Sequence, residues 1–172
     1  MGYVLLLGGA RSGKSSLACR LAAESGLDVT CIATATAEDA EMAARIARHR
    51  EDRPAAWTTV EEPLEVLSAV RGASSRDHFL VVDCLTLWVS NLLGAGRTPP
   101  EIAVLASDVA RELASRRGVV VTNEVGLGIV PVSELGRTFR DVLGAVNATF
   151  AESAERSLLM VAGRVLELAA PG

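Results

Sequence analysis

The residues with the clearest chemical meaning lie near the start of the chain, where residues 8–15 read Gly-Gly-Ala-Arg-Ser-Gly-Lys-Ser. This run fits the phosphate-loop pattern in full. Glycines let successive backbone N–H groups point at phosphate oxygens, Lys14 adds a charge near the terminal phosphates, and the Ser15 hydroxyl can ligate Mg²⁺. The run predicts a triphosphate site formed by Gly8, Gly9, Ala10, Arg11, Ser12, Gly13, Lys14 and Ser15.

Asp83 is the second candidate for metal binding, because it directly follows the apolar run Phe79–Val82. If that run is a strand of a parallel sheet, Asp83 lies at the carboxyl end, where ligands bind in this architecture. The alternative is that Asp83 caps a helix over Leu85–Leu93. A phosphate-loop enzyme needs such a carboxylate, so we expect Asp83 to orient Mg²⁺, directly or through water.

His49 is the third candidate, on a predicted helical face that it shares with Met42 and Ile46. Arginines surround it in the sequence, at positions 45, 48, 50 and 53. Nearby arginines disfavour protonation of an imidazole, and a neutral imidazole is a competent nucleophile. The alternative is a histidine packed at a helix edge beside a solvated charged face. The pattern alone favours this structural interpretation.

The elements that must position these residues alternate between short apolar runs and longer helical stretches. Strands are predicted over Tyr3–Leu7, Val29–Ala33, Trp57–Val60, Phe79–Val82 and Val119–Thr122, followed by a terminal hairpin over Leu158–Val161 and Arg164–Leu168. Helices are predicted over Gly13–Glu24, Glu38–Arg50, Pro63–Val70, Leu85–Leu93, Glu101–Arg116 and Ser133–Glu152, with Gly144 as a candidate break in the last. The alternation predicts an α/β fold of the P-loop NTPase type, with three layers and a mostly parallel sheet that ends in an antiparallel hairpin strand.

Length and composition set the wider limits. The chain has 172 residues and is 49% apolar, which predicts one domain over residues 1–172 with a sizeable aliphatic core. Its formal charge of −4 provides no electrostatic footprint for nucleic acid or an anionic membrane. Cys19, Cys31 and Cys84 have no metal or redox spacing, and the apolar start is too short for a signal peptide or membrane span. These features favour a cytoplasmic protein with buried thiols.

Several stretches together resemble a known family. They are residues 8–15, Ile-Ala-Thr-Ala at 32–35, Glu-Met-Ala-Ala-Arg-Ile-Ala-Arg-His-Arg at 41–50, Arg-Pro-Ala-Ala-Trp at 53–57 and Thr-Asn-Glu-Val-Gly-Leu-Gly-Ile-Val-Pro at 122–131. In this order they resemble the bifunctional adenosylcobinamide kinase / adenosylcobinamide-phosphate guanylyltransferase family of cobalamin biosynthesis, over nearly the whole chain. The phosphate loop is generic, whereas the His-Arg and Thr-Asn-Glu-Val-Gly segments are far more specific.

The resemblance implies two reactions on corrinoid substrates, with GTP or ATP as the second substrate and Mg²⁺ as the metal. A nucleoside triphosphate first phosphorylates the aminopropanol hydroxyl of adenosylcobinamide. GTP then transfers GMP to an enzyme histidine, which passes it to the cobinamide phosphate. The family's guanylylated histidine maps onto His49, and Arg48 stands where some relatives carry an adjacent histidine. The resemblance also implies a homotrimer.

Other positions take roles from the same resemblance. Thr34, Ala35 and Thr36 are expected beside the nucleotide, and Arg50, Glu51, Asp52 and Arg53 are expected to contact it. Glu61 is a candidate guanine or ribose contact, or else a solvated glutamate. Asp83 stands where some relatives have glutamate, which favours a metal contact through water. Asn123, Glu124 and Gly126 are expected on the corrinoid side, with a structural turn as the alternative.

Two other functions stay open at this point. One is an ordinary small-molecule kinase in which His49 is structural, and the other is a nucleotide-dependent binding or regulatory protein without transferase chemistry. The sequence lacks the Asn-Lys-x-Asp motif by which switch GTPases read guanine. It does not decide between ATP and GTP for the first reaction.

Overall fold

A single twisted sheet organises the molecule. The computed structural model describes residues 2–37, 43–44, 47, 53–73 and 77–170. Within them, the sheet has the strand order β3-β2-β4-β5-β1-β6-β7. The strands are β1 (Tyr3–Gly8), β2 (Val29–Ala33), β3 (Thr58–Glu61), β4 (Phe79–Asp83), β5 (Gly118–Val121), β6 (Arg156–Val161) and β7 (Arg164–Leu168). All neighbours run parallel except β6 and β7, which confirms the predicted α/β fold and its antiparallel end.

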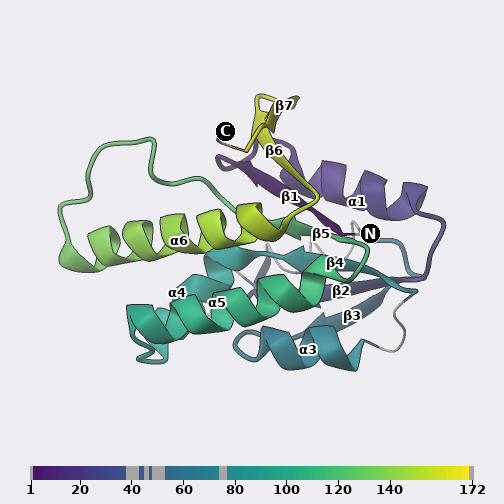
Figure 1. Cartoon of the computed structure of the whole chain (residues 1–172), viewed down its shortest axis with the longest axis horizontal. Coiled ribbons are helices and arrows are strands. Elements are labelled where there is room, and N and C mark those ends of the chain that lie inside the picture. The colour runs from purple at the N-terminus through teal and green to yellow at the C-terminus, as the bar shows by residue number, and fades with distance from the viewer. Residues whose placement is uncertain (1, 38–42, 45–46, 48–52, 74–76, 171–172) are drawn as a thin grey trace.

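Helices cover both faces of the sheet (Figure 1). Helix α1 (Lys14–Glu24) packs on one face, over an apolar cluster that includes Leu6 and Val81. The opposite face is covered by α3 (Val66–Gly72), α4 (Leu85–Gly94), α5 (Pro99–Ala114) and α6 (Glu134–Ser153). Strand residues alternate between the two clusters, as a doubly covered sheet requires. None of the helices in the described part of the chain combines the length and apolarity that a bilayer span requires.

Several predicted boundaries shift for local reasons. Helix α6 continues through Gly144, because the apolar residues on both sides of it, Leu143 and Val146, are buried in the same core cluster. Helix α5 begins at Pro99 rather than Glu101, since proline fits the first turn of a helix. Helix α3 begins later than predicted, at Val66. The carboxylate of Glu62 accepts hydrogen bonds from the backbone N–H groups of the two residues after Pro63, which forms a turn before the helix. The predicted helix over Glu38–Arg50 lies mostly outside the described residues.

The strand register brings the carboxyl ends of the central strands into one row. Ala33 of β2 is paired with Glu61 on one side and with Asp83 on the other. Asp83 in turn is paired with Val121, which is paired with Leu6 just before the phosphate loop. Side chains in one row of a parallel sheet point to the same face. Asp83 therefore faces the side on which α1 begins.

Candidate functional site

The loop between β1 and α1 folds tightly around Lys14. The Nζ atom of Lys14 donates to the carbonyl oxygens of Gly8 at 2.8 Å and Gly9 at 2.7 Å, and lies 3.4 Å from the Ser12 hydroxyl. Its side chain is only 7% exposed. Lys14 is also the only lysine in the sequence. A buried ammonium group in the first turn of a helix, behind a glycine-containing loop, is an arrangement that can hold a polyphosphate.

Gly8 and Gly13 are needed for steric reasons that the structure makes explicit. Both have positive φ values, 149° and 99°, which L side chains rarely adopt. A Cβ atom at Gly8 would lie 2.3 Å from the carbonyl oxygen of Met160 in β6. The turn after β6 also supports the loop directly, because the N–H of Gly163 donates to the Ser12 carbonyl at 3.1 Å. The C-terminal hairpin thus holds the phosphate loop in shape.

Asp83 lies at the end of β4 and is paired with an arginine. Its Oδ2 atom is 3.6 Å from Nη2 of Arg53, and both side chains are largely buried, at 22% and 11% exposure. Asp83 faces the α1 side of the sheet, where Ser15 occupies the first turn of the helix. The structure thus brings together Asp83 and Arg53, both predicted site residues.

The residues after β2 form a rigid corner. The Thr34 hydroxyl donates to the Cys84 carbonyl at 2.8 Å and accepts from the Cys84 N–H at 2.9 Å. Asn91 of α4 donates to the Thr34 carbonyl at 2.7 Å and contacts the hydroxyl of Thr36 at 3.5 Å. Thr34 is fully buried, whereas Ala35 and Thr36 are half-buried. Thr34 therefore fixes the ends of β2 and β4, and the two residues after it have surface to offer a ligand.

Glu61 lies at the outer end of this row, on edge strand β3, and is exposed. One strand, β2, separates it from Asp83, so their Cα atoms are roughly 10 Å apart. Its exposure leaves the carboxylate accessible from solvent. His49, Arg50, Glu51 and Asp52 lie outside the described residues.

The end of β5 lies between the phosphate loop and Asp83. The Glu124 N–H donates to the Gly8 carbonyl at 3.2 Å, and the Asn123 N–H donates to the Thr86 hydroxyl at 2.8 Å. Asn147 of α6 donates to the Asn123 carbonyl at 3.0 Å and accepts from the Thr122 hydroxyl at 2.7 Å. Sequence reasoning missed Asn147, although an amide on the apolar face of an amphipathic helix was a usable signal.

Two cysteines near the site are poor nucleophiles. Burial raises the pKa of the Cys31 thiol to about 12. Burial, together with the neighbouring Asp83 carboxylate, raises the pKa of Cys84 to about 11. A thiol reacts as its thiolate, so both cysteines are inert near neutral pH.

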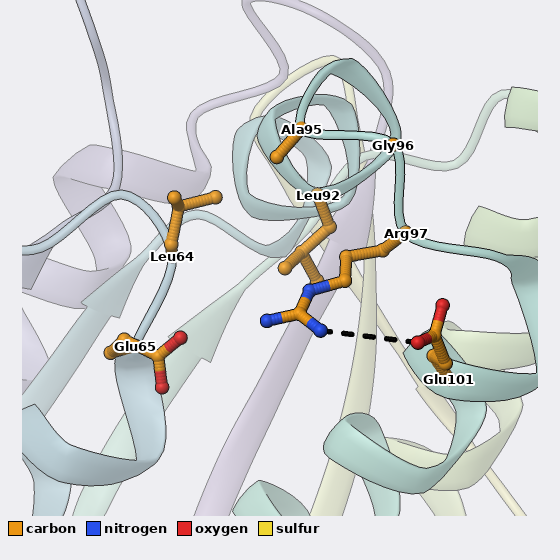
Figure 2. Close-up of a pocket in the computed structure, with 7 residues that line it drawn as sticks. All are labelled: Leu64, Glu65, Leu92, Ala95, Gly96, Arg97 and Glu101. Carbon is orange, nitrogen blue, oxygen red and sulfur yellow. Dashed lines mark ion pairs between the residues drawn. The ribbon is translucent and has the colours of Figure 1, made fainter.

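A pocket lies between the segment before α3, the end of α4 and the start of α5 (Figure 2). It is lined by Leu64, Glu65, Leu92, Ala95, Gly96, Arg97 and Glu101. Figure 2 shows the guanidinium of Arg97 directed at Glu101, and the two charges are 3.9 Å apart. Among the residues that the structure describes, none of those predicted to bind nucleotide lines this pocket.

The strand order, the loop after β1 and the carboxylate after β4 define an α/β protein of the P-loop NTPase type. A solved protein from Pyrococcus horikoshii has a similar fold, with a TM-score of 0.60 over 96% of this chain and 85% of its own, at 11% identity. The chain belongs to the cobinamide kinase / cobinamide phosphate guanyltransferase family, whose model matches residues 4–168.

Two named relatives agree with this assignment. The bifunctional adenosylcobalamin biosynthesis protein CobP of Pseudomonas aeruginosa is 49% identical, over 95% of each chain. The bifunctional adenosylcobalamin biosynthesis protein CobU of Escherichia coli is 40% identical, over 93% of this chain and 96% of its own. The resemblance inferred from the motifs is thereby confirmed.

Proposed function

We propose that this protein phosphorylates adenosylcobinamide with a nucleoside triphosphate and then transfers GMP from GTP, through His49, to adenosylcobinamide phosphate. The products of the second reaction are adenosylcobinamide-GDP and pyrophosphate. The observation that carries the proposal is the complete phosphate loop, closed around buried Lys14, in a member of this enzyme family.

The triphosphate lies along residues 8–15 in this proposal, with Lys14 near the terminal phosphates. Ser15 and Asp83 are the protein ligands for Mg²⁺, and the donor set fits because both side chains offer oxygen atoms on the α1 side of the sheet. Mg²⁺ is typically held by one or two such groups plus the substrate phosphates. When bound, it neutralises charge on the phosphate oxygens.

His49 is the nucleophile of the guanylyl transfer. An imidazole nitrogen forms a bond to the α-phosphorus of GTP, the bond from that phosphorus to the bridging oxygen breaks, and pyrophosphate leaves with the electron pair. A phosphate oxygen of the cobinamide phosphate then attacks the same phosphorus, and the P–N bond breaks. Arg53, held by Asp83, supports this step by placing a fixed positive charge beside the nucleotide.

The remaining proposed nucleotide contacts come from residues at or after the carboxyl ends of β2 and β3 and from the segment that contains His49. Ala35 and Thr36 offer half-buried surface after β2, and Glu61 offers an exposed carboxylate for guanine or ribose. Arg50, Glu51 and Asp52 complete the proposed set next to His49. Asn123, Glu124 and Gly126 lie toward the corrinoid.

Intact-protein mass spectrometry after incubation with GTP and Mg²⁺ tests the proposal. We expect a single acid-labile GMP adduct in the wild type and none in His49→Ala. Phosphorylation of adenosylcobinamide is measured in parallel. A protein that phosphorylates without any adduct is an ordinary small-molecule kinase, and one that does neither is a binding or regulatory protein.

A homotrimer completes the proposed assembly. The segment between β5 and α6 extends beyond the rest of the molecule (Figure 1) and exposes apolar side chains that suit contact with a second copy. Leu127, Ile129 and Val132 are the most exposed of these side chains. Light scattering should give a trimer for the wild type, and replacing the three residues by serine should reduce the mass. A monomeric wild type would contradict this part of the proposal.

A further inference from the structure

Glu124 is anchored to the same carbonyl oxygen as the phosphate-loop lysine. The Gly8 carbonyl accepts from Nζ of Lys14 at 2.8 Å and from the N–H of Glu124 at 3.2 Å. Both donors therefore lie within a few ångströms of one another, at the end of neighbouring strands β1 and β5. This places the backbone of Glu124 at the phosphate end of the loop.

The backbone before Glu124 is fixed from three elements. Thr86 of α4 accepts from the Asn123 N–H, and Asn147 of α6 donates to the Asn123 carbonyl. The Thr122 N–H donates to the Leu6 carbonyl of β1 at 2.9 Å. Thr122 and Asn147 are almost fully buried. Such a satisfied buried network holds one geometry, so Glu124 has a defined position rather than that of a free loop residue.

The Glu124 side chain keeps acceptor capacity. One carboxylate oxygen accepts from the Gly126 N–H at 2.5 Å, which leaves the second oxygen for another donor. The side chain is half-buried, and no cationic side chain in the described part of the chain is paired with it. Asp83, by contrast, is paired with Arg53. Of these two residues, whose backbones lie at the ends of β4 and β5 beside the phosphate loop, Glu124 is the one whose carboxylate is not engaged by an arginine in the described part of the chain.

We propose that the Glu124 carboxylate is the general base of the phosphoryl transfer, an inference that rests on the proposed function. The substrate hydroxyl oxygen forms a bond to the γ-phosphorus, and the bond between that phosphorus and the β–γ bridging oxygen breaks. The nucleoside diphosphate leaves with the electron pair. The hydroxyl proton moves to the second oxygen of Glu124.

The same reasoning assigns Glu124 to only one of the two reactions. An alcohol holds its proton near neutral pH and must lose it on attack. The acceptor of the second reaction is a phosphate monoester, which is largely ionised near neutral pH because its second pKa is about 6. Guanylyl transfer therefore needs no base at this position.

The test compares Glu124→Gln with the wild type. Glutamine keeps a carbonyl oxygen for the Gly126 N–H, so the turn is retained while proton acceptance is removed. We expect kcat for phosphorylation of adenosylcobinamide to fall about 10²- to 10⁴-fold, with KM for the nucleotide unchanged. Formation of the GMP adduct with GTP should proceed at the wild-type rate. Glu24→Gln, an exposed change at the far end of α1, is the matched control and should leave both rates unchanged.

A second variant separates chemistry from structure. In Glu124→Ala, added formate should restore part of the phosphorylation rate, because a small carboxylate can occupy the space and take the proton. Loss of both reactions in Glu124→Gln, or a phosphorylation rate within twofold of wild type, would overturn the inference. A wild type that phosphorylates and forms the adduct, with Glu124→Gln equally fast, overturns the inference alone. A wild type without phosphorylation overturns the proposed function as well.

Discussion

The loops that follow β1 and β5 begin side by side at the carboxyl ends of these neighbouring strands, yet they are built in different ways. The first closes on itself, with Lys14 bonded to carbonyl oxygens of its own loop. The second opens outward, and Leu127 and Ile129 are 84% and 97% exposed. Its first residues, Asn123 and Glu124, are held by partners from β1, α4 and α6. Its last residues are held by Arg137 of α6, which donates to the carbonyl oxygens of Pro131 and Val132.

The two loops differ in whether their shape is determined by residues nearby in the sequence or by residues far away in it. The hydrogen bonds that close the loop around Lys14 lie within residues 8–14, and the N–H groups of Glu124 and Gly163 support the loop from outside. The position of Glu124 depends on residues far away in the sequence, since its N–H donates to the carbonyl oxygen of Gly8 near the start of the chain. The first loop can therefore be recognised from a short motif, whereas the second acquires its role only in the folded sheet.

The largest expected effect is on the first loop. Lys14→Ala should lower both phosphorylation and adduct formation by about 10²- to 10³-fold, because both reactions depend on charge stabilisation by the same group. Rates of both reactions are measured side by side. Because Lys14 is the sole lysine, its acetylation can be followed in one peptide, and GTP should slow it. Normal adduct formation in Lys14→Ala would argue against a shared triphosphate site.

Gly8→Ala should destabilise the protein by ~3 kcal/mol, because it combines a strained backbone with a clash against the Met160 carbonyl. Chemical denaturation without nucleotide measures the free energy of unfolding. Gly9→Ala is the matched control, since its added Cβ would have no neighbour within 4 Å. Equal stability of the two variants would show that the hairpin does not constrain this loop.

Asn147→Leu tests the non-local support of the second loop. It leaves the Thr122 hydroxyl and the Asn123 carbonyl without their partner, so we expect a loss of about 2 kcal/mol in the free energy of unfolding. Phosphorylation should slow more than adduct formation, because Glu124 loses its fixed position. Thr149→Val, a half-buried change on the same helix, is the control. Equal slowing of both reactions would contradict a specific role for this network.

Gly126→Ala should have the smallest effect. Its added Cβ would lie 3.0 Å from the Glu124 carboxylate, which must shift by a few tenths of an ångström. We expect phosphorylation to slow roughly threefold, because small misplacements of a reacting group reduce the rate less than ångström-scale ones. Adduct formation should not change. An unaltered phosphorylation rate would place the Glu124 carboxylate away from the reacting hydroxyl.

The sequence predicted best those elements whose structure depends on residues that are close together in the chain. The phosphate loop follows from glycine placement, and the strands follow from short apolar runs. Each predicted strand is present in the sheet, with bounds that differ by up to two residues. The boundaries near Pro63 and Pro99 were wrong, because the turn formed by Glu62 and the tolerance of proline in a first turn decide them.

The non-local contacts could not be predicted. Nothing in the pattern pairs Arg53 with Asp83 or places Asn147 beside Thr122, since strand order and helix packing bring these residues together. Thr34 was expected beside the nucleotide, and the sequence did not predict that its hydroxyl donates to the Cys84 carbonyl and accepts from the Cys84 N–H. The assignment of His49 rests on the family and stays a prediction.

The position of β1 in the sheet has a consequence for synthesis on the ribosome. The first strand to emerge lies between β5 and β6, which are among the last, and the turn after β6 holds the Ser12 carbonyl. The phosphate loop therefore lacks its neighbours β5 and β6 until nearly the whole chain has left the exit tunnel, and it cannot reach its final structure before then. A protein made in this order completes its phosphate loop last.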